Sequence, residues 1–172
     1  MKTVLIYICF AATLAIAKCN YYTIENPTIS YYNPKYMKDP VYTVTKNADD
    51  ETYTIHMEGE NLIKFDDKIT LTLTLLTKVD DQYQPTGLSK TFKLCKFFED
   101  PFGKLLLQQL PSMKCPFPAQ KHTFTFKSLA LNQIPFAKNL DSSWKTGVRI
   151  EMRMDTDSKE SIIKSSSDIK LK

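Results

Sequence analysis

Two stretches of alternating apolar and polar residues constrain this fold more than any other feature of the sequence. In residues 69–78, isoleucine and leucine alternate with threonine as far as Leu75, and residues 147–155 strictly alternate valine, isoleucine and methionine with charged residues. Successive side chains of a strand point to opposite sides of its sheet, so this pattern is typical of a strand with one buried face. The sequence therefore predicts β-sheets with one apolar and one polar face.

Shorter patterns of the same kind lie along the rest of the chain. We expect further strands over residues 41–46, 51–57, 90–98, 122–127 and 160–171, the last of them weak and polar, and an edge strand or irregular arm over residues 18–39. Turn signals separate them at residues 47–50, 58–61, 80–81, 85–87 and 157–158. About eight strands with turns roughly every 8 to 15 residues predict an all-β sandwich or barrel.

One segment, residues 95–117, departs from the strand pattern. Asp100 can cap a helix, Pro101 suits a first helical position, and Pro111 ends the run. Apolar residues at helical spacing give this short helix one apolar stripe, made of Phe102, Leu105, Leu106 and Leu110. Cys95 and Cys115 bracket the helix, so we expect a clasp over one end of the sandwich.

The N-terminal residues predict a secreted protein. Lys2 precedes an apolar run that ends in Ala15-Ile16-Ala17, which is typical of a signal peptide over residues 1–17. Residues 18–172 then form a single domain, large enough to bury a core. No second apolar stretch of about 20 residues follows, so no integral membrane segment is expected.

Cysteine usage agrees with an oxidising compartment. The expected mature chain keeps Cys19, Cys95 and Cys115, and in such a compartment Cys95 and Cys115 are the natural disulfide pair. Cys19 is then left over. Cys19 either remains a free thiol near the N-terminus or forms a disulfide with another chain, such as a dimer partner. The sequence leaves both possibilities open.

The composition argues against nucleic-acid binding and against catalysis. The formal net charge is +4, without a run of basic residues, and the four glycines are too scattered for a phosphate-binding loop. His56 and His122 have no neighbouring ligands at metal-site spacing, and paired carboxylates fall in turns. We therefore expect no catalytic residues, no cofactor and no metal.

The residues that remain are apolar side chains in surplus. Aromatic residues make up 12% of the chain, and Met152 and Met154 lie on an inward strand face. Methionine suits adaptable apolar surfaces, and splayed sheets can leave a cavity for a lipid. An ordinary packed core explains the same composition, and the composition alone does not decide between them.

The order of these signals resembles an insect secreted family of the lipid-recognition (ML) superfamily, whose relatives include the ganglioside activator and the sterol-carrying Niemann–Pick protein. The resemblance spans about residues 69–154. The residues that carry it are Cys95, Pro101, Leu106, Leu110, the run Cys115-Pro116-Phe117, Phe124, Phe126, Pro135, Gly147, Val148 and Arg149. Relatives often have Gly and Tyr shortly after the Cys-Pro, where this chain has Ala119-Gln120-Lys121-His122.

The resemblance implies an immunoglobulin-like β-sandwich that holds a lipid or other hydrophobic small molecule between its sheets, in chemosensation or lipid transport. It implies binding rather than catalysis. The alternative is an extracellular immunoglobulin-like module that binds a protein partner and has a filled core. Residues expected to line the cavity are Leu71, Leu73, Leu75, Phe102, Leu106, Leu110, Phe124, Phe126, Val148, Ile150 and Met152.

Overall fold

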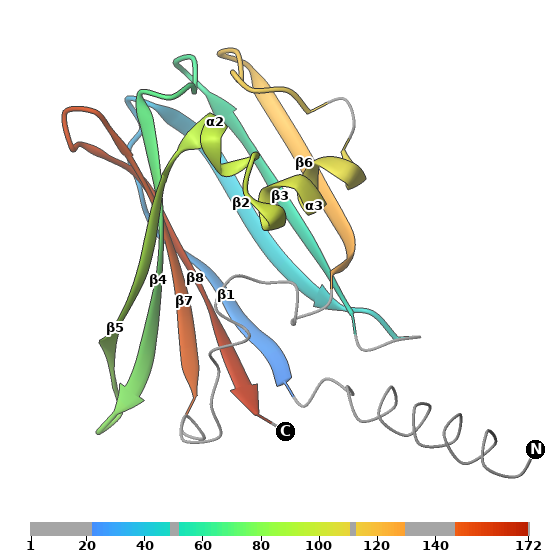
Figure 1. Ribbon diagram of the computed structural model, residues 1–172, viewed down its shortest axis with the longest axis vertical. Coiled ribbons are helices and arrows are strands. Elements are labelled where there is room, and N and C mark those ends of the chain that lie inside the picture. The colour runs from blue at the N-terminus through green and yellow to red at the C-terminus, as the bar shows by residue number, and fades with distance from the viewer. Residues whose placement is uncertain (1–21, 49–51, 111–112, 130–146, 172) are drawn as a thin grey trace, which may run out of the picture.

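The structure of the chain is a computed structural model, and it describes residues 22–48, 52–110, 113–129 and 147–171. The expected signal peptide, Cys19, Pro111 and Pro135 lie outside these ranges. Two antiparallel sheets face each other as a sandwich, so the all-β sandwich expected from the sequence is confirmed (Figure 1).

The larger sheet has five strands in the order β1-β8-β7-β4-β5. Its elements are β1 (Tyr22–Tyr32), β8 (Ser161–Leu171), β7 (Val148–Thr156), β4 (Ile69–Val79) and β5 (Gln82–Lys93). The two alternating stretches are neighbours in this sheet: Leu71 pairs with Met154, and Leu73 pairs with Met152. Their apolar side chains therefore share the inner face, while the threonines of β4 lie on the outer one.

The smaller sheet has three strands, β2 (Met37–Lys46), β3 (Tyr53–Asn61) and β6 (Lys121–Leu129), in the order β2-β3-β6. Its inner face carries Ile55 and Met57 of β3 and Phe124 and Phe126 of β6, and Met57 pairs directly with Phe124. On one side of the sandwich β1 of the larger sheet lies against β2, so the two sheets are joined there.

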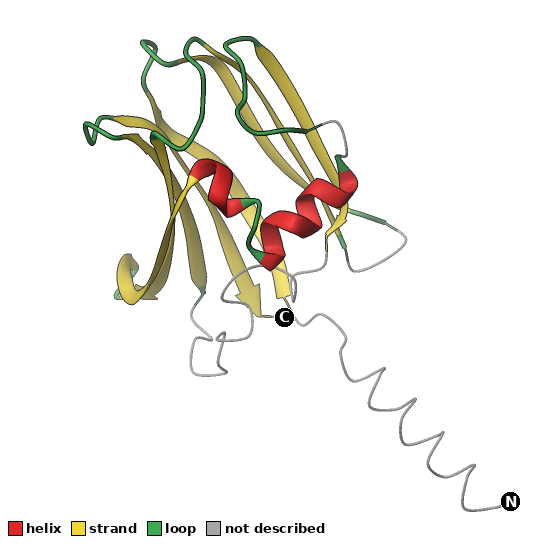
Figure 2. Cartoon of the chain, turned by 45° about the horizontal axis from the view of Figure 1, so that its top comes forward, coloured by secondary structure: helices red, strands yellow, loops and turns green. Residues whose placement is uncertain are grey.

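Two short helices lie on the opposite side, between the edge strands β5 and β6 (Figure 2). They are α2 (Leu94–Phe97) and α3 (Pro101–Gln109), and Cys95 forms a disulfide with Cys115 across them. We call the described residues 94–110 and 113–117 the strap. The predicted helix and disulfide are thus present, and the strap covers the gap between the two sheets on this side of the sandwich.

Buried apolar residues form two clusters. The larger lies between the middle of the sandwich and the strap, and its members include Ile69, Leu71, Leu73, Leu94, Phe97, Phe117, Phe126 and Ile163. The smaller consists of Tyr53, Leu75, Val148 and Ile169, each at most 3% exposed. It fills the end of the sandwich where β4 ends and β7 begins.

Several expected boundaries are wrong. The strand predicted over residues 90–98 ends at Lys93, so Cys95 lies in a helical turn. The predicted turns at residues 58–61 and 85–87 are parts of β3 and β5, because pairing with neighbouring strands outweighs their local turn propensity. The turn at Asp80 and Asp81 is confirmed, and both residues have positive φ, as a tight hairpin requires.

Candidate functional site

A cavity of about 270 Å³ lies between the two sheets, beneath the strap. It extends from Phe65 and Phe117, whose backbones pair in an isolated bridge, to Ile169 of the smaller cluster and Ile24, which packs against that cluster. Nearly all of its wall is apolar. The volume is close to the lower end of the roughly 300–1,000 Å³ that is typical of small-molecule sites.

Both sheets contribute side chains to the wall, because the inner faces of their strands converge on it. From the larger sheet these are Leu71, Leu73, Ile150, Met152, Met154 and Ile163, and from the smaller sheet Met37, Ile55, Met57, Phe124 and Phe126. Four of these residues are methionines: Met37, Met57, Met152 and Met154. Their flexible thioethers let a wall adapt to the shape of what it contacts.

The strap supplies the third side of the cavity. Leu94 and Phe97 of α2, Leu106 of α3 and Met113 all line it. Gly103 makes this arrangement possible, because a Cβ atom there would stand 2.1 Å from the carbonyl oxygen of Phe97. Only glycine allows α3 to pass so close to α2.

Aromatic rings connect the strap to both sheets. Phe97 packs edge-to-face against Phe92 of β5 and against Phe98, with ring centroids 5.4 and 5.2 Å apart. Phe98 meets Phe117 at 5.7 Å, and Phe117 meets Phe124 of β6 at 5.9 Å. Such pairs each contribute about 0.5–1.5 kcal/mol beyond burial, so the series fixes the strap over the cavity.

The structure brings together most of the residues that the sequence proposes as cavity lining. Those that line the cavity are Leu71, Leu73, Leu106, Phe124, Phe126, Ile150 and Met152. Leu75 and Val148 do not; they belong to the smaller, filled cluster. Leu110 packs against the larger cluster without reaching the cavity, and the side chain of Phe102 is not among those described.

The failures at Leu75 and Val148 have a common cause. Alternation shows which face of a strand is buried, and both residues are on the expected inner face. It does not show which inward-facing residues border open space and which pack into filled core. Leu75 and Val148 pack in the smaller cluster, although their cross-strand partners Ile150 and Ile169 line the cavity.

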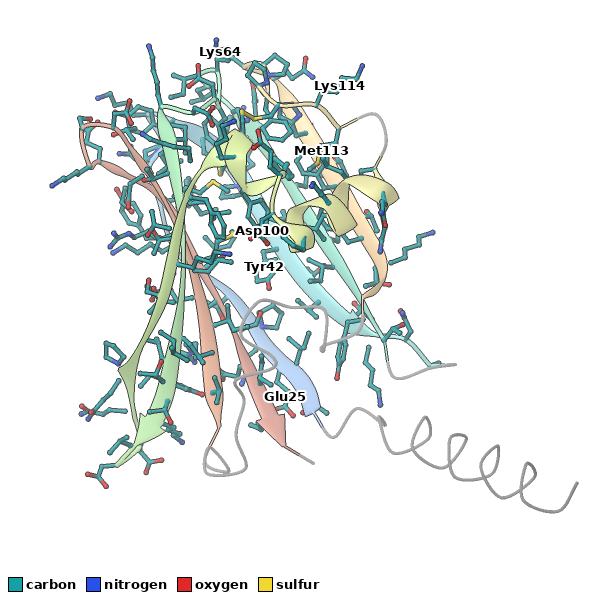
Figure 3. All side chains as sticks on the ribbon, in the orientation of Figure 1. Glu25, Tyr42, Lys64, Asp100, Met113 and Lys114 are labelled. Atoms are coloured by element: carbon teal, nitrogen blue, oxygen red, sulfur yellow. A yellow bond between two sulfur atoms is a disulfide. The ribbon has the colours of Figure 1, made fainter. Side chains whose placement is uncertain are left out.

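Sequence reasoning missed the polar part of the wall. Tyr42 of β2 and Ser165 and Ser167 of β8 line the cavity, and the Tyr42 hydroxyl lies 2.8 Å from Ser167 Oγ. Figure 3 labels Tyr42 in the space between the two sheets. Burial raises the pKa of the Tyr42 phenol, although the Ser167 hydrogen bond lowers it, so the phenol is neutral at physiological pH. The signal available in the sequence was the inward register of Ser165 and Ser167 between Ile163 and Ile169.

No lysine or arginine is among the described residues that line the cavity. The one carboxylate there is Glu58, which is also solvent-accessible and lies 2.7 Å from Lys121 Nζ. The hydrogen bond from Lys121 lowers the pKa of Glu58. His122 also lines the cavity; its ring stacks on Phe124, and its Nε2 lies 2.9 Å from the Pro118 carbonyl oxygen.

The described residues offer no cluster of three or more His, Cys, Asp or Glu that could hold a metal ion. None of the helices within the described ranges is long and apolar enough to cross a membrane. What the site has is shape, apolar surface and a few uncharged hydroxyls. Chemically, such a site can enclose and orient an apolar molecule.

No protein-family model matches the chain, and no curated protein matches its sequence. Among solved structures, the fold is similar to that of chicken MD-1 complexed with lipid IVa. The sequence identity is 14%, the match covers 90% of this chain and 93% of that one, and the TM-score is 0.43.

Proposed function

We propose that this protein is a secreted, non-catalytic binding protein that carries a lipid or another hydrophobic small molecule between its two β-sheets. The observation that carries the proposal is the cavity of about 270 Å³, which both sheets and the strap line with apolar side chains. Interior space of this kind is where small-molecule sites occur in proteins.

The energetics of an empty cavity support the same proposal. Apolar wall that contacts no ligand forgoes the stabilisation that its burial would give, about 25 cal/mol per Å². Whole domains are stable by only about 5–15 kcal/mol. An apolar ligand that fills the space would recover much of that loss, and its binding would raise the free energy of unfolding.

The rival interpretation is an interaction module that binds a protein through its surface. Tyr31 and Tyr32 on the edge strand β1 are each 43% exposed, and they favour this alternative. An interaction module has no use for an apolar cavity, however, and a filled core would be more stable. The cavity therefore favours the carrier.

Secretion and physiological setting belong to the proposal as well. The expected signal peptide and the Cys95–Cys115 disulfide support an extracellular protein. Chemosensation or lipid transport is the setting implied by the resemblance to the insect ML-like family.

The direct test is native mass spectrometry of protein purified from its own tissue, before and after extraction with organic solvent. We expect an added mass of a few hundred daltons that disappears on extraction, in the range of lipids and similar ligands. The extracted protein should then bind the neutral fluorescent probe N-phenyl-1-naphthylamine. A chain that carries no added mass and binds no probe would favour the interaction module.

A further inference from the structure

The interior strand β8 carries hydroxyl groups where a buried strand normally carries aliphatic side chains. Along its inner face the sequence runs Ile163, Ser165, Ser167, Ile169. Ser165 and Ser167 are 3% and 7% exposed, and they pair with Met152 and Ile150 of β7. A polar group buried without a partner is destabilising, so two serines in this place need a reason.

Packing does not supply that reason. Valine or isoleucine in place of either serine would extend the apolar wall formed by Ile163 and Ile169. Tyr42 faces these serines from the other sheet, and its hydroxyl adds a third oxygen to the group. We call Tyr42, Ser165 and Ser167 the hydroxyl cluster.

The hydroxyl cluster has hydrogen-bonding capacity to spare. Each hydroxyl can donate one hydrogen bond and accept two. The contact between Tyr42 and Ser167 uses one donor, and no described residue forms a side-chain hydrogen bond with Ser165. The cluster therefore retains donors and acceptors that face the cavity.

The charges around the cavity determine which ligand group can use these hydrogen-bond donors and acceptors. No cation lines the cavity among the described residues, and the nearest charged lining group is the carboxylate of Glu58. A buried anion is tolerated only when it is paired, so a carboxylate or phosphate placed beside the cluster would be costly. A neutral oxygen, by contrast, can accept and donate hydrogen bonds there at little cost.

We infer that the ligand is a neutral lipophile with a hydroxyl or carbonyl oxygen, and that this oxygen hydrogen-bonds to the hydroxyl cluster while the apolar body fills the cavity. The inference rests on the proposed carrier function and names the chemical class of its ligand. Alcohols, ketones and esters of long apolar groups belong to this class; fatty acids in their ionised form and phospholipid head groups do not.

The test uses delipidated full-length protein and compounds that share one chain length. Bound N-phenyl-1-naphthylamine is displaced with tetradecanol, methyl tetradecanoate, tetradecane or ionised tetradecanoate at neutral pH. We expect the alcohol and the ester to displace the probe at about tenfold lower concentration than the alkane or the carboxylate, as one or two buried hydrogen bonds would give.

Variants that lack hydroxyl groups of the cluster test whether these groups bind the ligand oxygen. In the double variant Tyr42→Phe, Ser165→Val, the preference for alcohol over alkane should fall to about threefold or less, because Ser167 is then the one hydroxyl of the cluster that remains. The matched control is Tyr31→Phe, which removes the same hydroxyl from an exposed position outside the cavity and should keep the preference. If the double variant does not fold, Tyr42→Phe alone should reduce the preference, since its ring is retained.

The outcomes separate this inference from the proposed function. If neither the probe nor any of the compounds binds, the carrier proposal is wrong, and the inference falls with it. If they bind but tetradecanoate competes as well as tetradecanol, or if the folded Tyr42→Phe variants keep the full preference for the alcohol, only the inference is overturned.

Discussion

Adding a ring inside the cavity should stabilise the protein or leave it unchanged, whereas adding the same ring to the filled cluster should destabilise it. Met152 lines the cavity from β7, and Leu75 lies in the smaller cluster on β4 with no exposed surface. Both are inward-facing residues of adjacent strands in one sheet. Met152→Trp and Leu75→Trp therefore form a matched pair.

The expected changes in the free energy of unfolding follow from the apolar area that each substitution buries. A tryptophan side chain buries about 150–250 Å², worth about 4–6 kcal/mol at about 25 cal/mol per Å². A buried methionine contributes about 1.5–3 kcal/mol, so in empty space Met152→Trp should gain up to a few kcal/mol. In the filled cluster, overpacking should cost about 1–3 kcal/mol or more. For a domain of this size that lowers the melting temperature by about 2–12 °C.

Both variants are measured as delipidated proteins, by thermal unfolding and by titration with N-phenyl-1-naphthylamine. Met152→Trp should keep or raise the melting temperature and lose most of its probe binding. Leu75→Trp should lower the melting temperature and, at temperatures where it is folded, still bind the probe. Equal destabilisation by both substitutions, with probe binding unchanged in Met152→Trp, would refute the reasoning that the cavity is open space for a ligand.

Three further predictions concern the strap and the outer face of the larger sheet. Gly103→Ala should lower the melting temperature by several degrees, because its Cβ would collide with Phe97 of α2. The control Gly59→Ala should not, because the nearest atom to its Cβ would be 3.5 Å away. Equal effects of the two substitutions would contradict the close approach of the two helices. Cys115→Ala should cost about 3 kcal/mol in urea unfolding, from the loss of a disulfide that closes a loop of about 20 residues, and an unchanged midpoint would argue against the bond. Burial alone raises the pKa of Asp168, but the hydrogen bonds led by Arg149 outweigh it and lower the pKa overall. The stability from Asp168 is therefore present above its unfolded pKa and lost as the pH falls through its folded pKa, so Asp168→Asn should cost about 1–3 kcal/mol at neutral pH and close to nothing in strong acid; a pH-independent difference would contradict this ion pair.

The sequence predicts the sandwich because its strand signals depend on local alternation alone. Leu71 and Leu73 must face inward once β4 is a strand, since a shift of one residue would expose every leucine of that strand. The disulfide and the short helix were also predictable, from two cysteines that are a natural pair in an oxidising compartment and from Pro101 at the first helical position. These signals lie in the same residues that form each feature.

Features set by distant contacts were not predictable in this way. Gly59 and its neighbours form a local turn signal, yet they lie in β3 because β2 and β6 pair with them on both sides. Leu94 to Phe97 form α2 rather than the end of a strand, and a short apolar run reads equally well as either. In each case the outcome depends on segments far away in the sequence.

The strand β8 shows why the candidate site was only half predictable. Its serines and lysines are typical of a weak strand at the edge of a sheet, but β8 lies inside the sheet between β1 and β7. Ile162, Ile163 and Ile169 supply enough buried apolar surface to hold it there. Ser165 and Ser167 add no apolar surface to that burial, and under the proposed carrier function a ligand would explain their place in the cavity wall. Sequence patterns detect residues that a fold needs; the polar residues of a cavity wall become visible only when the opposing sheet, here through Tyr42, shows what they face.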